Sequence, residues 1–305
     1  MDRKLIAGGL VALLCLAEAL LAQDTMMDTP SGQASTITYK LEPVSSRHDN
    51  YTRSQGVNNR ATGPAAQGPK PTVVLVHGGF TDASAWDRVI KQLQNDGFPV
   101  IAPANPLRGL QTDSAYLASV LDTLSGPVIL VGASEGGIIV SNAAAMTQNA
   151  HNVQALIFVA AFIPDVGERA VDLTPLPGSL IGPATLQVRP CPVASCPAGV
   201  ELYIEPADFH KVMTGDLSQD KTNVLAAAQR GVSPTLSTEP SEFAAWHTVP
   251  TFAIVATEDN AIGTANERVM AQRANAQVVE VQASHFVMIS HPEAVVSVIE
   301  SAGQR

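Results

Sequence analysis

Short runs of apolar residues, many of them β-branched, recur along the chain from residue 72 onwards. An unbroken run of this kind is typical of a strand buried on both faces of a parallel sheet. Six runs predict strands: 72–76, 99–102, 128–131, 155–160, 251–256 and 278–281.

Segments with helical spacing lie between these runs. One carries Trp86, Val89, Ile90 and Leu93, and another is predicted to begin at a Thr112 cap and to bury Leu117, Val120, Leu121 and Leu124. A helix of small residues is expected through 143–146, and Pro292 is expected to open a terminal helix. Strands that alternate with helices predict an α/β fold with a doubly wound, mostly parallel sheet.

One long segment breaks the alternation. Between Pro164 and Val249 there is no buried-strand run, but many Pro, Gly and scattered apolar residues. An insertion of this length in a compact α/β unit is usually functional, and ligands bind such sheets at the carboxyl ends of the strands. We therefore predict a lid over about residues 165–249, inserted before the strand at 251–256.

The N-terminus has the features of an export signal. Arg3 and Lys4 precede an apolar stretch from Leu5 to Leu16. Ala17-Glu18-Ala19 then supplies small residues at the positions that a signal peptidase reads, and Ala22 offers a second cleavage position. We expect residues 1–22 to be a signal peptide and the protein to be exported, either periplasmic or secreted. An uncleaved anchor is the alternative, although the run is short for a stable membrane span.

A polar segment separates this signal from the predicted domain. Residues 23–70 are rich in Ser, Thr, Asn, Gln and Gly, which predicts a flexible extension, with one edge strand at 35–41. The domain itself is expected over 71–305.

The composition and net charge limit the kinds of binding partner that can be expected. The chain is 46% hydrophobic and 15% charged, as in a globular protein, and its net charge is −10 without a block of Lys or Arg. Nucleic acid is therefore not expected as a partner, because phosphate binding needs a basic surface.

The chain has three cysteines, of which Cys15 would leave with the signal. Cys191 and Cys196 are close in sequence, and in an oxidising compartment such a pair more often forms a local disulfide than a metal site. We predict this disulfide and no metal site. Two incidental loop thiols are the alternative.

Gly132-Ala133-Ser134-Glu135-Gly136 follows a predicted buried strand and precedes a predicted helix. This is the G-x-S-x-G nucleophile elbow in its required context, with glycines where a sharp turn leaves no room for side chains. The motif predicts Ser134 as a nucleophile.

Gly78-Gly79-Phe80 follows His77 at the end of the first predicted strand. The backbone N–H groups of Gly79 and Glu135 are candidates for an oxyanion hole. An ordinary loop is the alternative for this segment on its own.

An acid and a histidine should follow the serine in that order. Glu258 and Asp259 follow the strand at 251–256, and His285 follows the strand at 278–281. We choose Asp259 as the acid, with Glu258 as the alternative, and His285 as the base. His291 precedes Pro292 and is expected to cap the last helix.

With these motifs in place, the sequence resembles the α/β-hydrolase superfamily over about residues 72–302, and its small serine-esterase branch in particular. That branch includes methyl esterases, hydroxynitrile lyases and pyrethroid-type esterases. The similarity lies in LVHGGFTDASAW, APANPLRGL, VGASEGG, ATEDNAI and VQASHFVMISHPEAV. The resemblance implies the triad Ser134, Asp259 and His285, with the Gly79 and Glu135 amides as the oxyanion hole.

Two departures from the relatives bear on the chemistry. The residue after the nucleophile is commonly aromatic, Met, Leu or Gln, whereas here it is Glu135. A solvent-directed carboxylate near a helix N-terminus is the simpler interpretation, and a pocket charge that repels anions or raises the pKa of His285 is the functional one. Gly78 and Phe286 stand where the lyases carry a hydroxylated residue and a lysine, which counts against cyanohydrin chemistry.

The expected function is hydrolysis of carboxylic esters of small or moderately apolar substrates through an acyl-enzyme, without a cofactor. Lactone opening or cofactor-free perhydrolysis with the same triad is the alternative, and a catalytically silent ligand-binding protein is a third. The candidates for an apolar substrate pocket are Phe80, Phe162, Met213, Trp246 and Phe286.

Overall fold

The computed structural model describes residues 70–304. The predicted signal peptide, Cys15, the expected strand at 35–41 and nearly all of the predicted extension lie outside the described residues. Within 70–304, none of the helices combines the length and the apolar character that a membrane crossing requires.

A six-stranded parallel sheet forms the centre of the molecule, in the order β2-β1-β3-β4-β7-β8. Each apolar run of the sequence forms one of its strands, which confirms the predicted fold class. The central strands are buried almost throughout, because helices cover both faces. The strands are β1 (Thr72–Val76), β2 (Val100–Ile101), β3 (Val128–Ser134), β4 (Val153–Ala161), β7 (Thr251–Ala256) and β8 (Gln277–Val281).

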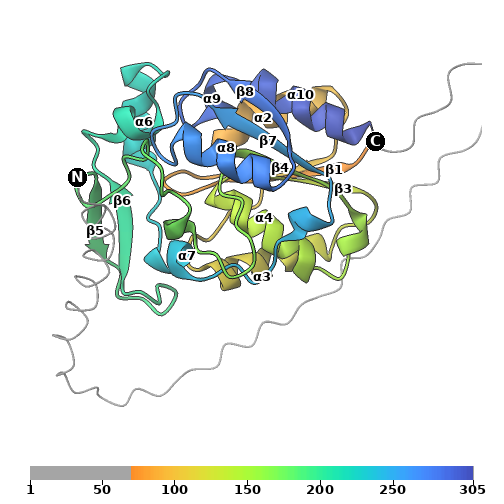
Figure 1. The fold of residues 1–305 in the computed structure, drawn as a ribbon, viewed down its shortest axis with the longest axis horizontal. Coiled ribbons are helices and arrows are strands. Elements are labelled where there is room, and N and C mark those ends of the chain that lie inside the picture. Colours follow the sequence, from red (N-terminus) through yellow and green to blue (C-terminus); the bar gives the residue numbers. More distant parts are fainter. Residues whose placement is uncertain (1–69, 305) are drawn as a thin grey trace, which may run out of the picture.

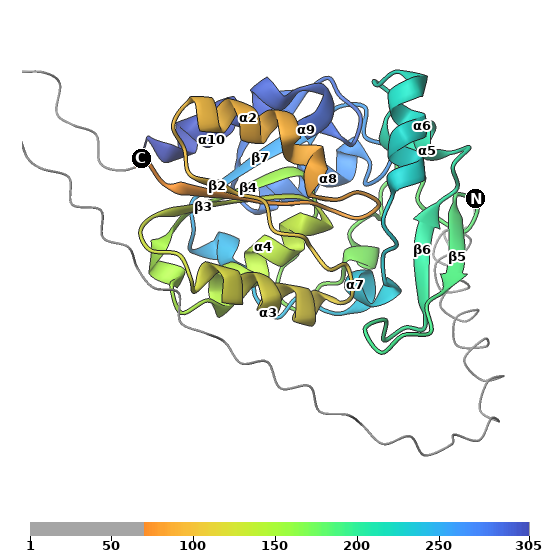
Figure 2. The ribbon, with the colours of Figure 1, turned by 180° about the vertical axis from the view of Figure 1, so that it is seen from behind.

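Helices lie on both faces of this sheet. Figure 2 shows α2 and α10 on one face and α3 and α4 on the other. The helices of this part are α2 (Asp87–Asn95), α3 (Leu110–Leu121), α4 (Glu135–Met146), α8 (Thr264–Arg273), α9 (Val287–Ser290) and α10 (Pro292–Gly303), with short 3₁₀ turns η1 (Ala83–Trp86) and η2 (Ala150–Asn152).

Two helices differ from the expectation. α3 begins at Leu110 after a Gly109 cap, and Thr112 lies within the first turn, where its hydroxyl donates to the Gly109 carbonyl instead of capping the helix. α8 was not predicted, because its sequence is mostly polar and only a few of its side chains face the core.

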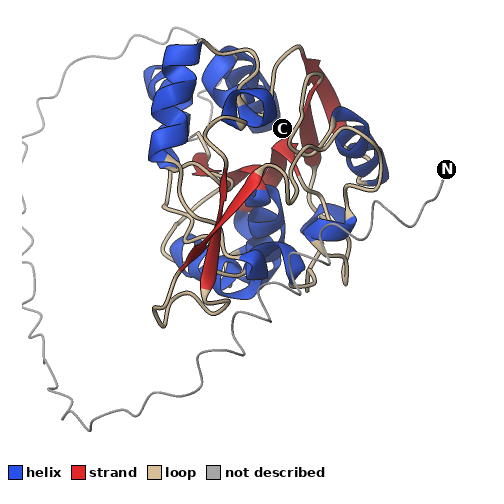
Figure 3. Cartoon of the chain, turned by 90° about the vertical axis from the view of Figure 1, so that its left-hand side faces the viewer, coloured by secondary structure: helices blue, strands red, loops and turns tan. Residues whose placement is uncertain are grey.

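The segment between β4 and β7 forms a structure of its own, which the sequence did not predict. Its two strands pair antiparallel as a separate sheet. Figure 3 shows this pair from its own side, in front of the main sheet. The elements are η3 (Ala170–Asp172), β5 (Leu186–Pro190), β6 (Val200–Ile204), α5 (Phe209–Met213), α6 (Gln219–Ala228), α7 (Pro234–Thr238) and η4 (Ala245–His247).

This insertion lies beside the carboxyl ends of the main strands (Figures 1 and 2). Leu180 donates its N–H to the Asn260 carbonyl, and Phe286 donates its N–H to the Met213 carbonyl. It therefore packs on the loops that follow β7 and β8. Its action as a lid stays a prediction.

Candidate active site

Ser134 stands at the junction of β3 and α4, in a backbone conformation that few residues adopt. Its φ is +52° and its ψ is −124°. A non-glycine residue with positive φ is strained, and such strain persists where the surrounding fold enforces it. The turn holds the serine at the carboxyl end of a buried central strand.

The glycines on either side of Ser134 make this turn sterically feasible. A Cβ atom added to Gly132 would lie 2.4 Å from the Gly136 carbonyl oxygen, and one added to Gly136 would lie 2.4 Å from the Val76 carbonyl oxygen. Both distances are far below van der Waals contact, and both partners are backbone atoms. The predicted reason for glycine at these positions therefore agrees with the packing.

His285 and Asp259 form a buried pair. His285 Nδ1 lies 2.6 Å from Asp259 Oδ2, although the residues come from the loops after two different strands. Asp259 Oδ1 accepts the backbone N–H groups of Ala261 and Ile262 at 2.6 and 2.9 Å. Glu258 is exposed and accepts a hydrogen bond from Gln282. The geometry thus pairs Asp259, and not Glu258, with the histidine.

The charges of this pair support each other. Burial would lower the pKa of His285, but the charge and hydrogen bond of Asp259, with a further contribution from the charge of Glu135, raise it above its ordinary value. Burial would likewise raise the pKa of Asp259, but His285 and the nearby donors hold it below the ordinary range. The carboxylate therefore stays ionised against the ring that it orients.

Glu267 on α8 is a second buried acid, next to Asp259, and it was not among the residues predicted from the sequence. Its side chain is 2% exposed, and Oε2 accepts the N–H of Ala256. Oε1 receives no N–H or O–H from the described residues. Burial and the neighbouring charge of Asp259 raise the pKa of Glu267 well above its usual range. A carboxyl group that keeps its proton can donate it to Asp259, so the two acids share one negative charge.

Nothing in the sequence marked Glu267, because it lies in a polar stretch of ordinary helical composition. Only the packing of α8 against β7 buries it.

Glu135 does not point to solvent. Its side chain is 6% exposed, and its Oε2 accepts two hydrogen bonds, one from Ser134 Oγ at 2.7 Å and one from the N–H of Gly79 at 2.8 Å. The expectation of a solvent-directed carboxylate is therefore wrong. Gly79 N, the predicted oxyanion donor, is directed at the Glu135 carboxylate and lies near Ser134.

His77 holds in place the loop that contains Gly78 and Gly79, here called the glycine loop. The N–H of Asn105 donates to His77 Nε2 at 3.0 Å, so Nδ1 carries the proton and donates to the Gly78 carbonyl at 2.9 Å. Asn105 Nδ2 also donates to the His77 carbonyl. Burial, the largest effect, lowers the pKa of His77, which keeps the ring neutral.

The residues predicted for the substrate pocket take different places. Phe286 adjoins His285 in sequence and packs edge-to-face on Phe209 of α5, and Met213 ends the same helix. Phe80 is buried beside Gly79, and Phe162 donates its N–H to the Ser134 carbonyl. These four lie near the triad loops, and their contact with substrate stays a prediction.

Trp246 lies elsewhere. It precedes the amino end of β7, whereas the triad residues follow carboxyl ends, and its indole donates to the Pro164 carbonyl at 2.8 Å. These contacts do not connect it to Ser134.

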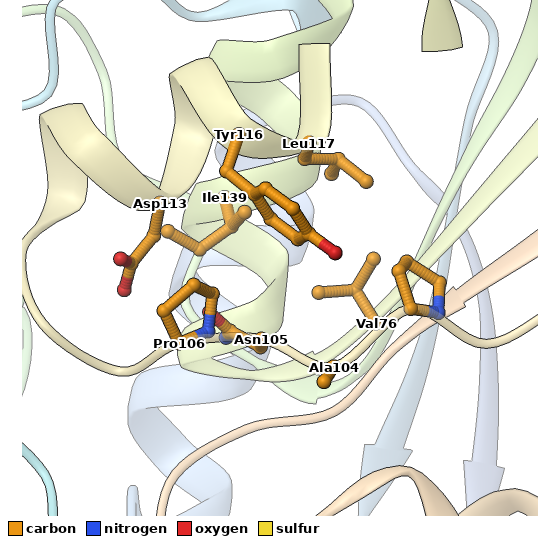
Figure 4. A pocket seen from close by; sticks show the side chains of 9 residues that line it. Val76, Ala104, Asn105, Pro106, Asp113, Tyr116, Leu117 and Ile139 are labelled. Atoms are coloured by element: carbon orange, nitrogen blue, oxygen red, sulfur yellow. The ribbon is translucent and has the colours of Figure 1, made fainter. Parts of the chain in front are cut away.

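A small hollow lies between the end of β1, the loop after β2 and α3. Figure 4 shows the ring of Tyr116 projecting from α3 into it, beside Asn105 and Asp113. No triad residue lines it. It therefore adds nothing to the site around Ser134.

The predicted disulfide is not formed in the structure, where Cys191 and Cys196 are free thiols. Their sulfur atoms and a carboxylate oxygen of Glu201 lie within 4.8 Å of one another. Burial, together with the neighbouring Cys191, raises the pKa of Cys196 to about 12, and the Cys196 thiol donates to the Val200 carbonyl.

The two cysteine sulfur atoms and the Glu201 carboxylate could supply metal ligands, but the Arg108 side chain lies against them. The guanidinium contacts both Glu201 and Cys196. A protonated thiol and a fixed positive charge are unfavourable for a cation, so we assign no metal to this group.

The doubly wound sheet, the strained elbow and the His–Asp pair at the strand ends together define the class of α/β hydrolases. The model of the alpha/beta hydrolase family matches residues 73–298, and the chain belongs to this family. No relative was found among the curated protein sequences.

Solved structures of this fold include esterases of the expected branch. Polyneuridine aldehyde esterase matches with a TM-score of 0.64 at 19% identity, over 76% of this chain and 98% of that one. A pyrethroid hydrolase from Sphingobium faniae JZ-2 matches with a TM-score of 0.63 at 22% identity, over 77% and 97%. An extracellular alpha/beta-hydrolase from a Paenibacillus species has a TM-score of 0.63 at 16% identity, over 77% and 100%. At these identities the likeness concerns the fold.

Proposed function

We propose that this protein is a serine hydrolase that cleaves carboxylic esters through an acyl-enzyme formed on Ser134. The proposal is carried by the buried His285–Asp259 pair at the strand ends, together with a serine in a strained elbow at the carboxyl end of β3. A serine hydroxyl is a weak nucleophile and needs an oriented histidine to take its proton.

In the proposed reaction, Ser134 Oγ attacks the ester carbonyl while His285 takes the hydroxyl proton and passes it to the leaving alcohol. Water then attacks the acyl group, and the proton returns to Ser134 through His285. Asp259 holds the imidazole in the tautomer that accepts at Nε2. The N–H groups of Gly79 and Glu135 are the proposed donors to the oxyanion.

The hydroxyl of Ser134 must change partner for this reaction. In the free protein it donates to Glu135, and it makes no bond to His285 among the described residues. We expect substrate binding to displace the Glu135 carboxylate and to turn the hydroxyl towards His285, as is common when hydrogen bonds of a free enzyme tighten in the complex.

Labelling with a fluorophosphonate tests the proposal. We expect one phosphonyl adduct per chain, located on Ser134 by peptide mapping, and loss of ester turnover in parallel with labelling. Ser134→Ala should prevent both. Labelling at another residue, or equal ester turnover by wild type and Ser134→Ala, would refute the proposed function.

We also propose that the protein is exported after removal of an N-terminal signal. The proposal rests on the basic start, the apolar stretch and the small residues that follow it. Expression of the full chain in bacteria, followed by N-terminal sequencing of the periplasmic fraction, tests it. A chain that retains Met1 in the cytoplasm would contradict it.

A further inference from the structure

Glu135 carries a negative charge in the position that the oxyanion of the reaction would occupy. One oxygen, Oε2, accepts both the Ser134 hydroxyl and the Gly79 N–H. A substrate carbonyl oxygen needs the same N–H and must lie equally close to Ser134. The carboxylate and the substrate therefore compete for one place.

Within residues 70–304, Oε1 of Glu135 accepts no hydrogen bond, and no Lys, Arg or His forms an ion pair with this carboxylate. Oε1 is not one of the fully buried atoms without a partner in this part of the chain. The side chain is nevertheless 94% buried, the complement of its 6% exposure. A buried carboxylate without a cation is costly, and a ligand that supplies a cation removes that cost.

Glu135 lies against the loop of Gly78 and Gly79, which in turn packs on the insertion. A Cβ atom added to Gly79 would lie 3.2 Å from Glu135 Oε2 and 2.8 Å from Val232 Cγ2. A carboxylate that gives up the Gly79 N–H and the Ser134 hydroxyl is still tethered to the residue that follows the nucleophile. When a substrate carbonyl takes the Gly79 N–H, the carboxylate stays next to the acyl group. Its charge then acts on whatever the acyl group carries near the carbonyl.

We propose that Glu135 determines substrate specificity by charge, so that the site prefers esters whose acyl group bears an ammonium or other cationic nitrogen next to the carbonyl, and excludes acyl groups with a carboxylate there. This inference rests on the proposed ester hydrolysis at Ser134. It assigns a role to the residue at which the chain departs from its relatives.

Three methyl esters of matched shape test the charge dependence. Methyl alaninate carries an ammonium, methyl isobutyrate a methyl group and monomethyl methylmalonate a carboxylate at the same carbon. Hydrolysis would be followed by titration of released acid near pH 7, below the ordinary pKa of an α-amino group, about 8. The readout is the ratio of kcat/KM for each charged ester to that for methyl isobutyrate.

The three esters differ in intrinsic reactivity, but this difference cancels when the kcat/KM ratios of wild type are compared with those of Glu135→Gln. We expect the cationic-to-neutral ratio to fall about tenfold or more in Glu135→Gln, and the anionic-to-neutral ratio to rise by a similar factor, as for the loss of one close charge contact. Glu258→Gln removes the same charge from an exposed position at the same edge of the sheet, and it should leave both ratios unchanged.

The possible outcomes distinguish a failure of charge selection by Glu135 from a failure of the proposed ester hydrolysis at Ser134. Ser134-dependent turnover with both ratios within twofold of wild type in Glu135→Gln would overturn the charge selection and leave the esterase in place. Absence of Ser134-dependent turnover for all three esters would overturn the proposed function and the inference with it. If Glu135→Gln fails to fold, Glu135→Met provides the same comparison, because Met is common at this position in the relatives.

Discussion

Two adjacent carboxylates at the end of β7 have opposite environments. Asp259 is buried and bonded to His285 and to two backbone N–H groups, whereas Glu258 is exposed and contacts only Gln282 among the described residues. An acid orients a histidine only through direct contact, so the proposed role falls to Asp259.

Asp259→Asn should lower kcat for a neutral ester by roughly 10³–10⁴, because the amide favours the wrong tautomer of His285. Glu258→Gln is the matched control and should retain kcat within about twofold, as expected of a surface change. The measurement is steady-state hydrolysis of a nitrophenyl ester by both variants. Equal losses in the two variants would contradict the assignment.

The raised pKa of His285 predicts the acid limb of the pH profile. Only the neutral ring accepts the serine proton, so kcat/KM should fall as pH drops through the pKa of the free enzyme. Because Asp259 and Glu135 outweigh the effect of burial, the midpoint should lie above 6.5, the ordinary value. In the part of the chain that the structure describes, the carboxyl groups that act on the His285 ring are those two, and Glu267 lies behind Asp259.

Glu135→Gln should move this midpoint to lower pH, since one of the charges that favour the imidazolium is lost. Methyl isobutyrate is the suitable substrate, because it does not titrate. A midpoint that stays in place, or that lies below 6.5 in the wild type, would contradict the electrostatic account.

At the scale of elements, β3, α4 and β1 approach one another so closely at the nucleophile elbow that Gly132 and Gly136 have no room for a side chain. Gly136→Ala would place a methyl group 2.4 Å from the Val76 carbonyl oxygen. Because backbone must shift to relieve this overlap, we expect a loss of about 1–3 kcal/mol in stability and a Tm lower by several degrees. Ester turnover should fall as well, since Ser134 moves with the turn.

Gly182→Ala is the matched control for this change. An added Cβ at Gly182 has no neighbour within 4 Å and its φ is not positive, so Tm should not fall. Thermal unfolding followed by circular dichroism compares the two variants. A Gly136→Ala protein with the Tm of Gly182→Ala would show that the elbow tolerates a side chain.

At the scale of the whole molecule, Glu267 links global stability to pH. Its pKa is raised in the folded protein, so the unfolded chain releases this proton at about pH 4 while the folded protein retains it. Stability from this group therefore decreases as pH rises above the ordinary pKa towards the raised one, by up to about 1.4 kcal/mol per pH unit. Asp259 has the opposite effect, and its contribution is lost as pH falls.

Glu267→Gln keeps a donor for Asp259 and an acceptor for Ala256 but does not ionise. We therefore expect its Tm, relative to that of wild type, to increase from pH 5 to pH 8. Thermal unfolding at several pH values measures this difference. A constant difference would mean that Glu267 is already ionised in the folded protein.

Much of this architecture could be predicted locally. The runs at 72–76 and 128–131 identify buried strands because β-branched apolar residues serve few other purposes in such numbers. The insertion was less predictable. β5 is mostly exposed and β6 mostly half-buried, so neither has the apolar run of a buried strand, and β6 packs on α7 and bridges to Val232 through contacts that no local pattern reveals. α8 was not predicted because its sequence is mostly polar, and only its packing on β7 buries some of its side chains.

The fold class, the chain order of Ser134, Asp259 and His285, and the strand ends that they follow could all be predicted from the sequence, because hydrophobic periodicity and motif spacing are local properties. The tertiary structure shows which carboxylate contacts His285, that Glu267 is buried behind Asp259, and that the Glu135 side chain turns towards Ser134. Each of these depends on burial and on distances between segments remote in the chain, and burial controls both the cost of a charge and the partner that can relieve it.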